Sequence, residues 1–305
     1  MTYDILDINA QLRRDPEAAI ARWEQGYADQ IDQVARYIID TKHTSPVVLL
    51  AGPSGSSKTS TATAIRNRLL ALGQMAHLIS MDNYYIARDD PNFPRLPDGS
   101  PDFEAPEGLD LQLLNEHFSI LEAGEDIYVP VFDFPTQRRL DSKGEFLDAT
   151  QGDVFIFEGI HALNELFTSS HPNAARVYVA PEALFEKDGR PFCGPVQLRL
   201  LRRVVRDHQF RGATADYSRS LWQNVIDSEK KYVLPHRENA NCRVVTTMPY
   251  ELGVLRPFAE PLLRDLGEDT PCYDQVSSVR ELLRDVDPVD AALVPEKSFL
   301  HEFIG

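Results

Sequence analysis

Short hydrophobic runs alternate with helix-like repeats along most of the chain. Five runs are rich in β-branched residues and short enough for strands that are buried on both faces. They lie at 46–51, 77–81, 154–157, 176–179 and 243–246. Amphipathic repeats separate several of them, and the repeat over 59–73 ends with Gly73 at a helix C-cap position. This alternation predicts βαβ units, and therefore an α/β fold with a doubly wound parallel sheet.

The remaining segments predict additions to this core. Residues 1–44 place apolar side chains on one helical face: Ala18, Ile20, Trp23, Tyr27, Ile31, Val34, Ile38 and Ile39. We expect a helical extension that packs on the core, with a partner-binding arm as the alternative. Residues 88–108 contain five prolines and two glycines and predict a loop at the sheet edge. A hairpin is expected at about 128–147.

The predicted organisation therefore has three parts. A core spans 45–247, between the N-terminal extension and a proline-interrupted helical extension over 248–305 that we expect to pack on it. The hairpin and an arginine-rich segment at about 199–213 belong to the core.

Charge and cysteine content narrow the function classes. The 305 residues include 31 Lys and Arg against 47 Asp and Glu, a net charge of −16 that argues against a nucleic-acid or anionic-membrane binder. Three cysteines without a CxxC pair make neither a disulfide framework nor a zinc site. The N-terminus lacks a signal-peptide pattern, and no hydrophobic run could span a bilayer. We therefore expect a cytoplasmic protein without a membrane partner.

The acidity is distributed unevenly. Residues 82–125 carry 2 basic against 11 acidic residues, whereas 45–81 carry 3 basic and no acidic ones. An acidic segment favours a neutral, hydroxyl-rich ligand over a phosphorylated one, and the basic segment suits phosphate.

The strongest motif follows the first predicted strand and opens a helix. It consists of Gly52, Pro53, Ser54, Gly55, Ser56, Ser57, Lys58 and Thr59, with Ser60 next. The N–H groups of such a loop and the helix N-terminus bind phosphate, the lysine reaches the β- and γ-phosphates, and the threonine hydroxyl ligates Mg²⁺. Ser57 stands where the P-loop pattern has glycine, which suits a serine only if its φ is not strongly positive. The alternative is a serine-rich helix cap.

Two carboxylates follow predicted parallel strands. Asp82 comes after 77–81 and Glu158 after 154–157, so both should lie in the crevice where such sheets bind ligands. Asp82 could accept a proton from a substrate hydroxyl or ligate Mg²⁺, and Glu158 matches the Mg²⁺-binding carboxylate of P-loop enzymes. Capping of a turn is the alternative for each.

Residues 196–211 predict a helix with four arginines on one face. They are Arg199, Arg202, Arg203 and Arg206, and few acidic residues accompany them. A solvated surface stripe is the ordinary interpretation, but unpaired arginines favour a lid that closes over transferring phosphate. The eight histidines show no metal-ligand spacing, and His161, near Glu158, is expected in the core or at the surface.

Together these residues resemble the uridine kinase and phosphoribulokinase family of P-loop kinases, in particular the longer bacterial branch of uridine kinase-like nucleoside kinases. The matching stretches run in family order over about 45–305: VVLLAGPSGSSKTSTA, ISMDNYY, PDFEAPEGLDLQLL, VPVFDFPTQRR, DVFIFEGIHALN, RLLRRVVRDHQFRG, YELGVLRPFAEPLL and SFLHEFIG. Members of that branch often carry an N-terminal TGS-type domain, in whose place this chain has the helical segment 1–44. The resemblance implies a three-layer αβα fold with the hairpin over the substrate site.

The resemblance also implies roles. Loop 52–59 with Ser60 would bind ATP, with GTP as an alternative donor, and Thr59, Glu158 and Asp82 would hold Mg²⁺. The catalytic set would be Asp82, which accepts the ribose 5′-hydroxyl proton, with Lys58, Arg206 and Arg211. Substrate-binding positions would be Tyr84, Tyr85, Phe103, Glu104, Phe132, Phe134, Gln137 and Arg203. Family relatives often form dimers or tetramers, so a homodimer or homotetramer is expected.

Two positions depart from the pattern of uridine-cytidine kinases, and both concern the alcohol that accepts the phosphate. Gln137 stands where uridine-cytidine kinases commonly have a base-reading histidine, and Ala213 where they have a sugar-contacting basic residue. The first hypothesis is a uridine or cytidine 5′-kinase of pyrimidine salvage. The second is a kinase of another nucleoside, a sugar phosphate or a polyol, and the third is a nucleotide-binding regulator without turnover, for which Ser57 is the best support.

Overall fold

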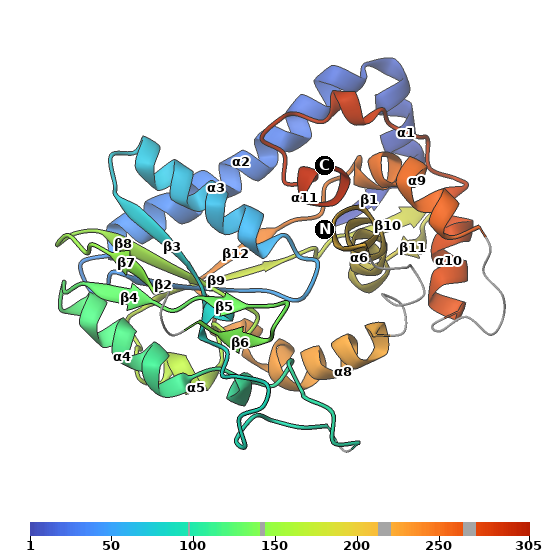
Figure 1. The fold of residues 1–305 in the computed structure, drawn as a ribbon. Helices are drawn as coiled ribbons and strands as arrows, with labels where there is room; N and C mark the ends of the chain where they lie inside the picture. The colour runs from blue at the N-terminus through green and yellow to red at the C-terminus, as the bar shows by residue number, and fades with distance from the viewer. Residues whose placement is uncertain (97, 141–143, 213–220, 265–272) are drawn as a thin grey trace.

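A five-stranded parallel sheet forms the centre of the protein (Figure 1). The computed structural model describes residues 1–96, 98–140, 144–212, 221–264 and 273–305. In spatial order the strands are β12 (Cys242–Val245), β9 (Ala175–Ala180), β2 (Val47–Ala51), β8 (Val154–Glu158) and β3 (Ala76–Ser80). Each neighbouring pair is parallel. All five strands predicted from the sequence lie in this sheet, which confirms the predicted α/β class.

Helices cover both faces of the sheet and give it three layers. The long helix α2 (Pro16–Thr41) and α3 (Lys58–Ala71) lie on one face, and α4 (Leu111–Glu122) lies on the other (Figure 1). Strand β2 shows why its sequence is continuously hydrophobic. Val48 and Leu50 join one core and Val47 and Leu49 join the other, so no residue of the strand can be polar. Burial of each such side chain contributes about 1.5–3 kcal/mol.

The strand register brings three loops to the same level. Leu50 of β2 is opposite Glu158 of β8, and Ser80 of β3 is opposite Glu158 from the other side. The segments that follow β2, β3 and β8 therefore emerge side by side at one edge of the sheet. These are the segments that hold the P-loop, Asp82 and Glu158.

The N-terminal segment is less uniform than the predicted extension. It contains strand β1 (Thr2–Asp4), helix α1 (Ile5–Arg14) and then α2. Asp15 separates the two helices because its side chain caps α2 at Ala18 N, at 3.0 Å, and Pro16 occupies the first turn. Helix α2 then packs against α3 and β12, which is the packing on the core that the apolar face predicts.

A second, three-stranded sheet was not predicted. Strand β1 pairs in parallel with β10 (Leu184–Lys187), and β10 pairs with β11 (Arg190–Cys193) in a hairpin. The turn residues Asp188 and Gly189 both have positive φ, 52° and 72°, as a tight Asp-Gly hairpin turn requires. The Asp-Gly pair is the sequence signal for this hairpin.

The predicted hairpin at 128–147 is present as two short nested ladders. Strand β4 (Ile127–Val129) pairs with β7 (Glu145–Leu147), and β5 (Phe132–Asp133) pairs with β6 (Arg138–Arg139). The Phe132 amide donates to Asn83 Oδ1 at 3.3 Å, and Arg139 Nη1 donates to Asp110 Oδ2 at 2.8 Å. Both arms are thereby attached to the segment after β3.

The remaining elements are helical, apart from short 3-10 turns. They are α5 (Glu165–Thr168), α6 (Pro195–Arg211), α8 (Trp222–Tyr232), α9 (Glu251–Leu262), α10 (Tyr273–Leu283) and α11 (His301–Ile304). Helices α9, α10 and α11 all pack against the arginine-rich helix α6, and α11 lies beside it in Figure 1. Among the described residues, none of the helices is long and apolar enough to cross a membrane.

Candidate active site

A cavity of about 790 Å³ opens at the carboxyl ends of β2, β3 and β8. The predicted site residues that line it are Ser54, Gly55, Ser57, Lys58, Thr59, Asp82, Tyr85, Phe103, Glu104, Phe132, Phe134, Gln137, Glu158, Arg203 and Arg206. They come from six separate segments of the chain. The sheet register and the hairpin attachments bring them together.

Some predicted residues do not line this cavity. Gly52, Pro53, Ser56 and Ser60 belong to the loop and the first turn of α3 but do not line the cavity wall. Tyr84 is a correction to the substrate-binding set, because it is fully buried and its hydroxyl bonds His117 Nδ1 at 2.9 Å. The side chain of Arg211 and all of Ala213 lie outside the described residues.

The loop 52–59 connects β2 to α3 as a P-loop does. A Cβ on Gly52 would lie 2.0 Å from the Val179 carbonyl oxygen, so only glycine fits there. Ser57 is the N-cap of α3 with φ 62° and ψ 38°, in the left-handed region. The condition under which a serine suits this position, a φ that is not strongly positive, is therefore not met. A left-handed residue other than glycine costs about 1–2 kcal/mol, so the surrounding contacts must hold Ser57 in place.

Three arginines of α6 bind the outer side of this loop. Arg202 Nη1 donates to the Gly55 carbonyl at 3.1 Å, and Arg199 Nη1 donates to the Ser54 carbonyl at 3.2 Å. Arg203 Nη1 adds a bond to Ser54 Oγ at 3.2 Å. When the N–H groups of a loop turn inward toward an anion, its carbonyls turn outward and need donors. The arginines supply those donors.

These arginines are paired with acids, which corrects the expectation of an unpaired stripe. Arg199 bonds Glu229 at 2.6 Å, and both side chains are less than 10% exposed. Arg202 bonds Glu251 at 2.7 Å with both side chains at 0% exposure. The partners lie on α8 and α9, far along the chain, so the helix sequence alone does not show them. Arg199 and Arg202 are therefore structural, and they do not line the cavity.

Arg203 and Arg206 remain at the cavity. Both lie near the buried Asp207, whose carboxylate oxygens are 3.4 Å from Arg203 Nε and 3.5 Å from Arg206 Nε. Each side chain is only about 14% exposed, so neither is a solvated surface arginine. They present positive charge at the cavity, where Arg203 directly contacts the P-loop.

Two cavity carboxylates titrate above their ordinary range. Burial raises the pKa of Glu158, which Lys58 lowers and Asp82 raises again. Burial likewise raises the pKa of Glu104, against the opposing effect of Arg203 and Lys58. The cavity thus concentrates negative charge that a cation could relieve.

The donor set fits a magnesium ion that is shared with phosphate. Thr59 Oγ1 donates to Glu158 Oε1 at 3.1 Å, and Asp82 lines the same cavity. Magnesium is commonly held by one or two carboxylates together with substrate phosphates and waters. Among the described residues no cluster of three or more His, Cys, Asp or Glu side chains could hold a metal by itself. Phosphate oxygens and waters would therefore complete the coordination.

Part of the cavity wall is aromatic. Tyr85, Phe103, Phe132 and Phe134 line it, and the rings of Phe132 and Phe134 meet edge-to-face with centroids 5.2 Å apart. Tyr85 is fixed by a 2.7 Å hydrogen bond from its hydroxyl to the Phe103 carbonyl. Phe134 is 58% exposed, an apolar ring at the surface that a bound ligand would cover.

Gln137 lines the same cavity, and its amide oxygen already accepts a hydrogen bond. Its Oε1 accepts from Arg88 Nη1 at 2.6 Å, and its backbone φ is 54°. Its Nε2 donates to no described residue, so the amide N–H₂ is the half that remains for a ligand.

Three lining residues were absent from the predicted set. Gly159 and Ile160 follow Glu158 directly, so the strand-end position could have indicated them. Glu302 comes from the C-terminal helix α11 and is remote in sequence. The only sequence signal for it was the match of the final stretch SFLHEFIG to the family.

His161 does not line the cavity. It is buried, and burial lowers its pKa to about 4, so it is neutral at physiological pH. The expectation of a core or surface position is confirmed.

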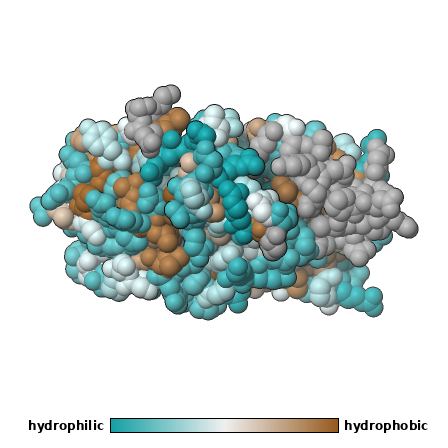
Figure 2. Space-filling model, turned by 60° about the horizontal axis from the view of Figure 1, so that its bottom comes forward, coloured by the Kyte–Doolittle hydropathy of each residue, from teal (hydrophilic) through white to brown (hydrophobic). Residues whose placement is uncertain are grey.

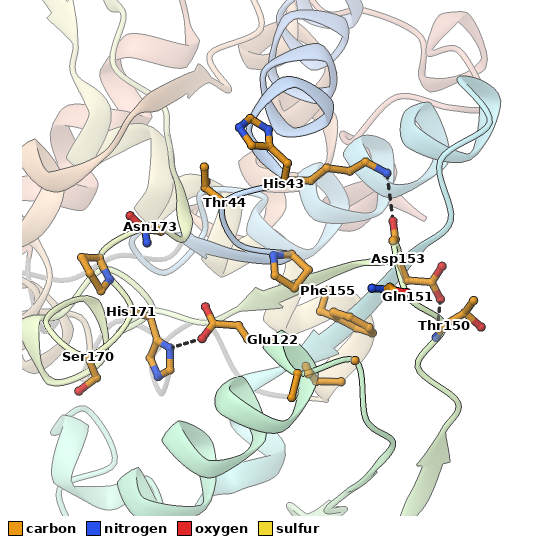
Figure 3. A pocket seen from close by; sticks show the side chains of 17 residues that line it. His43, Thr44, Glu122, Thr150, Gln151, Asp153, Phe155, Ser170, His171 and Asn173 are labelled. Carbon is orange, nitrogen blue, oxygen red and sulfur yellow. Dashed lines mark hydrogen bonds and ion pairs between the residues drawn. The ribbon is translucent and has the colours of Figure 1, made fainter.

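A second cavity, of about 500 Å³, lies at the amino ends of β2, β8 and β9 (Figure 3). In it His171 Nδ1 bonds Glu122 Oε2 at 3.2 Å. Ligands of open α/β sheets bind outside the carboxyl ends of the strands. The larger cavity is therefore the candidate site. Figure 2 shows the face with the segments after β3, which is largely hydrophilic with hydrophobic residues in separate small groups.

The fold and the loop define a P-loop protein with an αβα core. Residues 47–251 match the sequence model of the Phosphoribulokinase / Uridine kinase family, and the chain belongs to that family. Its members are kinases that transfer phosphate to an alcohol.

The chain is also similar to individual proteins. The chain is 28% identical over 205 residues to a uridine kinase of Ureaplasma urealyticum serovar 10, an alignment that covers 66% of this chain and 88% of the relative. Among solved structures, a possible uridine kinase from Bacillus stearothermophilus is 17% identical with a TM-score of 0.45, over 70% of this chain and 97% of the other. A D-glycerate 3-kinase from Cryptococcus neoformans var. grubii is 14% identical with a TM-score of 0.43, over 67% and 87%.

The raised pKa of Glu158 predicts a pH-dependent stability. The folded state keeps a proton on Glu158 at a pH where the unfolded chain, with a pKa of 4.5, has lost it. This contribution to stability is therefore greatest below that pH and falls as the pH rises through the folded pKa. Glu158→Gln removes the buried charge, so we expect it to be more stable than wild type at pH 8, by about 1 kcal/mol, and this advantage to shrink toward pH 5.

Urea unfolding at the two pH values measures this difference. The exposed Glu165 provides the control, and Glu165→Gln should leave the difference near zero at both pH values. A Glu158→Gln protein that is no more stable than wild type at pH 8 would contradict the conclusion that burial raises the pKa of Glu158.

Proposed function

We propose that this protein is an ATP- and Mg²⁺-dependent kinase that phosphorylates the 5′-hydroxyl of uridine or cytidine. One observation carries the proposal: a single cavity is lined both by the P-loop and by four aromatic side chains, with Asp82 and Glu158 also among its lining. A phosphate donor and a flat acceptor can both enter it, and carboxylates are available for the metal and the proton.

The donor end would bind the triphosphate. The N–H groups of loop 52–59 and Lys58 would hold the β- and γ-phosphates. Within the described part of the chain, Lys58 Nζ bonds only the Pro53 carbonyl, at 3.4 Å, a long contact that phosphate can replace. Thr59 and Glu158 would hold Mg²⁺, which when bound neutralises charge on the phosphate oxygens.

The acceptor end suits a neutral nucleoside. The aromatic rings of Phe132 and Phe134 offer a surface for the base, and the Gln137 N–H₂ can donate to a base carbonyl. Glu104, in the cavity wall, can accept from ribose hydroxyls. The acidic segment 82–125 favours such a ligand over one that is already phosphorylated.

The transfer would be an in-line displacement. The acceptor oxygen forms a bond to the γ-phosphorus as the bond from that phosphorus to the β–γ bridging oxygen breaks, and ADP leaves. Asp82 accepts the proton of the acceptor hydroxyl, and Arg206 stabilises charge on the phosphoryl oxygens. Positioning of the reactants and electrostatic stabilisation provide the rate enhancement, since the protein takes little part in the covalent chemistry.

A second candidate is a kinase of the same class with a phosphorylated acceptor. Arg88, bonded to Gln137 at 2.6 Å, brings a positive charge to the acceptor end. A sugar phosphate could use that charge, whereas a nucleoside does not need it.

A screen of alcohols with MgATP separates the two candidates. We expect ADP release with uridine and cytidine, and a 5′-monophosphate as product by mass spectrometry. Activity with a sugar phosphate, another nucleoside or a polyol while both pyrimidine nucleosides stay inert would contradict the proposed acceptor. ATP binding without a product from any alcohol would instead indicate a regulator.

Asp82→Asn tests the assigned proton acceptor. The amide cannot take the hydroxyl proton, so we expect kcat to fall by about 10²–10⁴-fold while ATP affinity changes little. Calorimetry and steady-state kinetics on the same preparation measure both. Asp148→Asn, the same change at an exposed aspartate, should behave as wild type, and near-normal turnover of Asp82→Asn would exclude the role.

A further inference from the structure

The C-terminal segment reaches the candidate active site. Helix α11 lies beside α6 (Figure 1), and Glu302 lines the cavity together with the P-loop and Arg206. Glu302 Oε2 accepts from Ser60 Oγ at 2.8 Å, and Glu302 Oε1 accepts from Arg206 Nη1 at 3.3 Å. One carboxylate thus connects the first turn of α3 to the cavity arginine of α6.

This segment is firmly anchored where it meets α6. Phe299 and Phe303 place their rings over the buried Arg202 guanidinium, with centroids 5.4 and 5.1 Å from Cζ. Leu300 is fully buried, and Ser298 Oγ donates to Glu24 Oε1 at 2.6 Å. Buried residues that precede and follow Glu302 in the sequence therefore fix its position.

The contacts of Arg206 leave part of its guanidinium for a ligand. Nη1 bonds Glu302, and Nε lies 3.5 Å from Asp207 Oδ1. Nη2 makes no hydrogen bond to a described residue. Two carboxylates thus fix the orientation of the guanidinium plane while one terminal nitrogen stays available at the cavity.

We propose that Glu302 is a positioning residue for phosphoryl transfer, which it serves by holding Arg206 at the cavity. This inference rests on the proposed kinase function. An arginine that is oriented before the nucleotide binds loses less rotamer freedom when it contacts phosphate, and its charge is in place when the transition state forms. Glu302 acts through Arg206 and touches no reacting atom.

Four proteins test the coupling: wild type, Glu302→Ala, Arg206→Ala and the double variant. If Glu302 acts through Arg206, Glu302→Ala lowers kcat by about ten- to a hundredfold, with the acceptor KM unchanged. In the Arg206→Ala background the second substitution then has no further effect. Glu302→Gln keeps one oxygen that can accept from Arg206 and gains an N–H₂ that can donate to Ser60 Oγ, but it loses the charge, so its kcat should lie between wild type and Glu302→Ala.

Glu296 supplies the matched control. It lies in the same segment and is exposed, so Glu296→Gln should leave kcat unchanged. Multiplicative losses in the double variant would overturn the proposal. Faster turnover of Glu302→Ala would also overturn it, because Glu302 would then compete with phosphate for Arg206.

Measurement of ATP affinity provides a test that does not depend on which alcohol is the acceptor. If no alcohol is phosphorylated, the proposed function fails, but calorimetric ATP titration of the same four proteins still measures the coupling. Equal losses of affinity in both single variants and the double variant support Glu302 as the residue that positions Arg206. Unchanged or tighter ATP binding by Glu302→Ala contradicts it.

Discussion

The site depends on the contact between the arginines of α6 and the carbonyls of the P-loop. Arg202 is the centre of this contact. Its fully buried guanidinium bonds the Gly55 carbonyl at 3.1 Å, the Thr246 carbonyl at 2.5 Å and Glu251 at 2.7 Å. A buried charge is tolerated only when its partners are this complete, and removal of one partner of such a pair typically costs about 3–5 kcal/mol. The loop, α9 and the C-terminal segment therefore meet at one side chain.

This arrangement explains how a protein with net charge −16 can present a phosphate site. The acids that pair with Arg199 and Arg202 lie on α8 and α9 and do not line the cavity, whereas Lys58 and Arg206 do line it. The same contacts offset the strain of the left-handed Ser57. Because the loop is held from outside, its carbonyls do not need to turn toward the ligand. Other segments of the chain, namely the hairpin and the segment after β3, form the part of the site that would bind the acceptor.

The sequence predicts the parts of this account that depend on local patterns. Strand β2 was recognisable because both of its faces are buried, and the P-loop, Asp82 and Glu158 because they follow strands at fixed offsets. Pairing across long sequence distances was not predictable, so Arg199 and Arg202 were misjudged and Glu302 was missed. Tyr84 shows a second limit, because two adjacent tyrosines after β3 are chemically alike, and only the packing against His117 distinguishes the buried one from the one at the cavity.

ATP affinity of an Arg202→Lys variant tests the central constraint most directly. Lysine keeps the charge but lacks the planar guanidinium group, so it cannot bond the Gly55 carbonyl, the Thr246 carbonyl and the Glu251 carboxylate at the same time. We expect ATP to bind at least about tenfold more weakly in calorimetry, in protein that circular dichroism shows to be folded. Arg13→Lys, in an exposed ion pair with Asp287, serves as the control and should bind normally. Unchanged ATP affinity in folded Arg202→Lys would show that the loop keeps its phosphate-binding shape without this arginine.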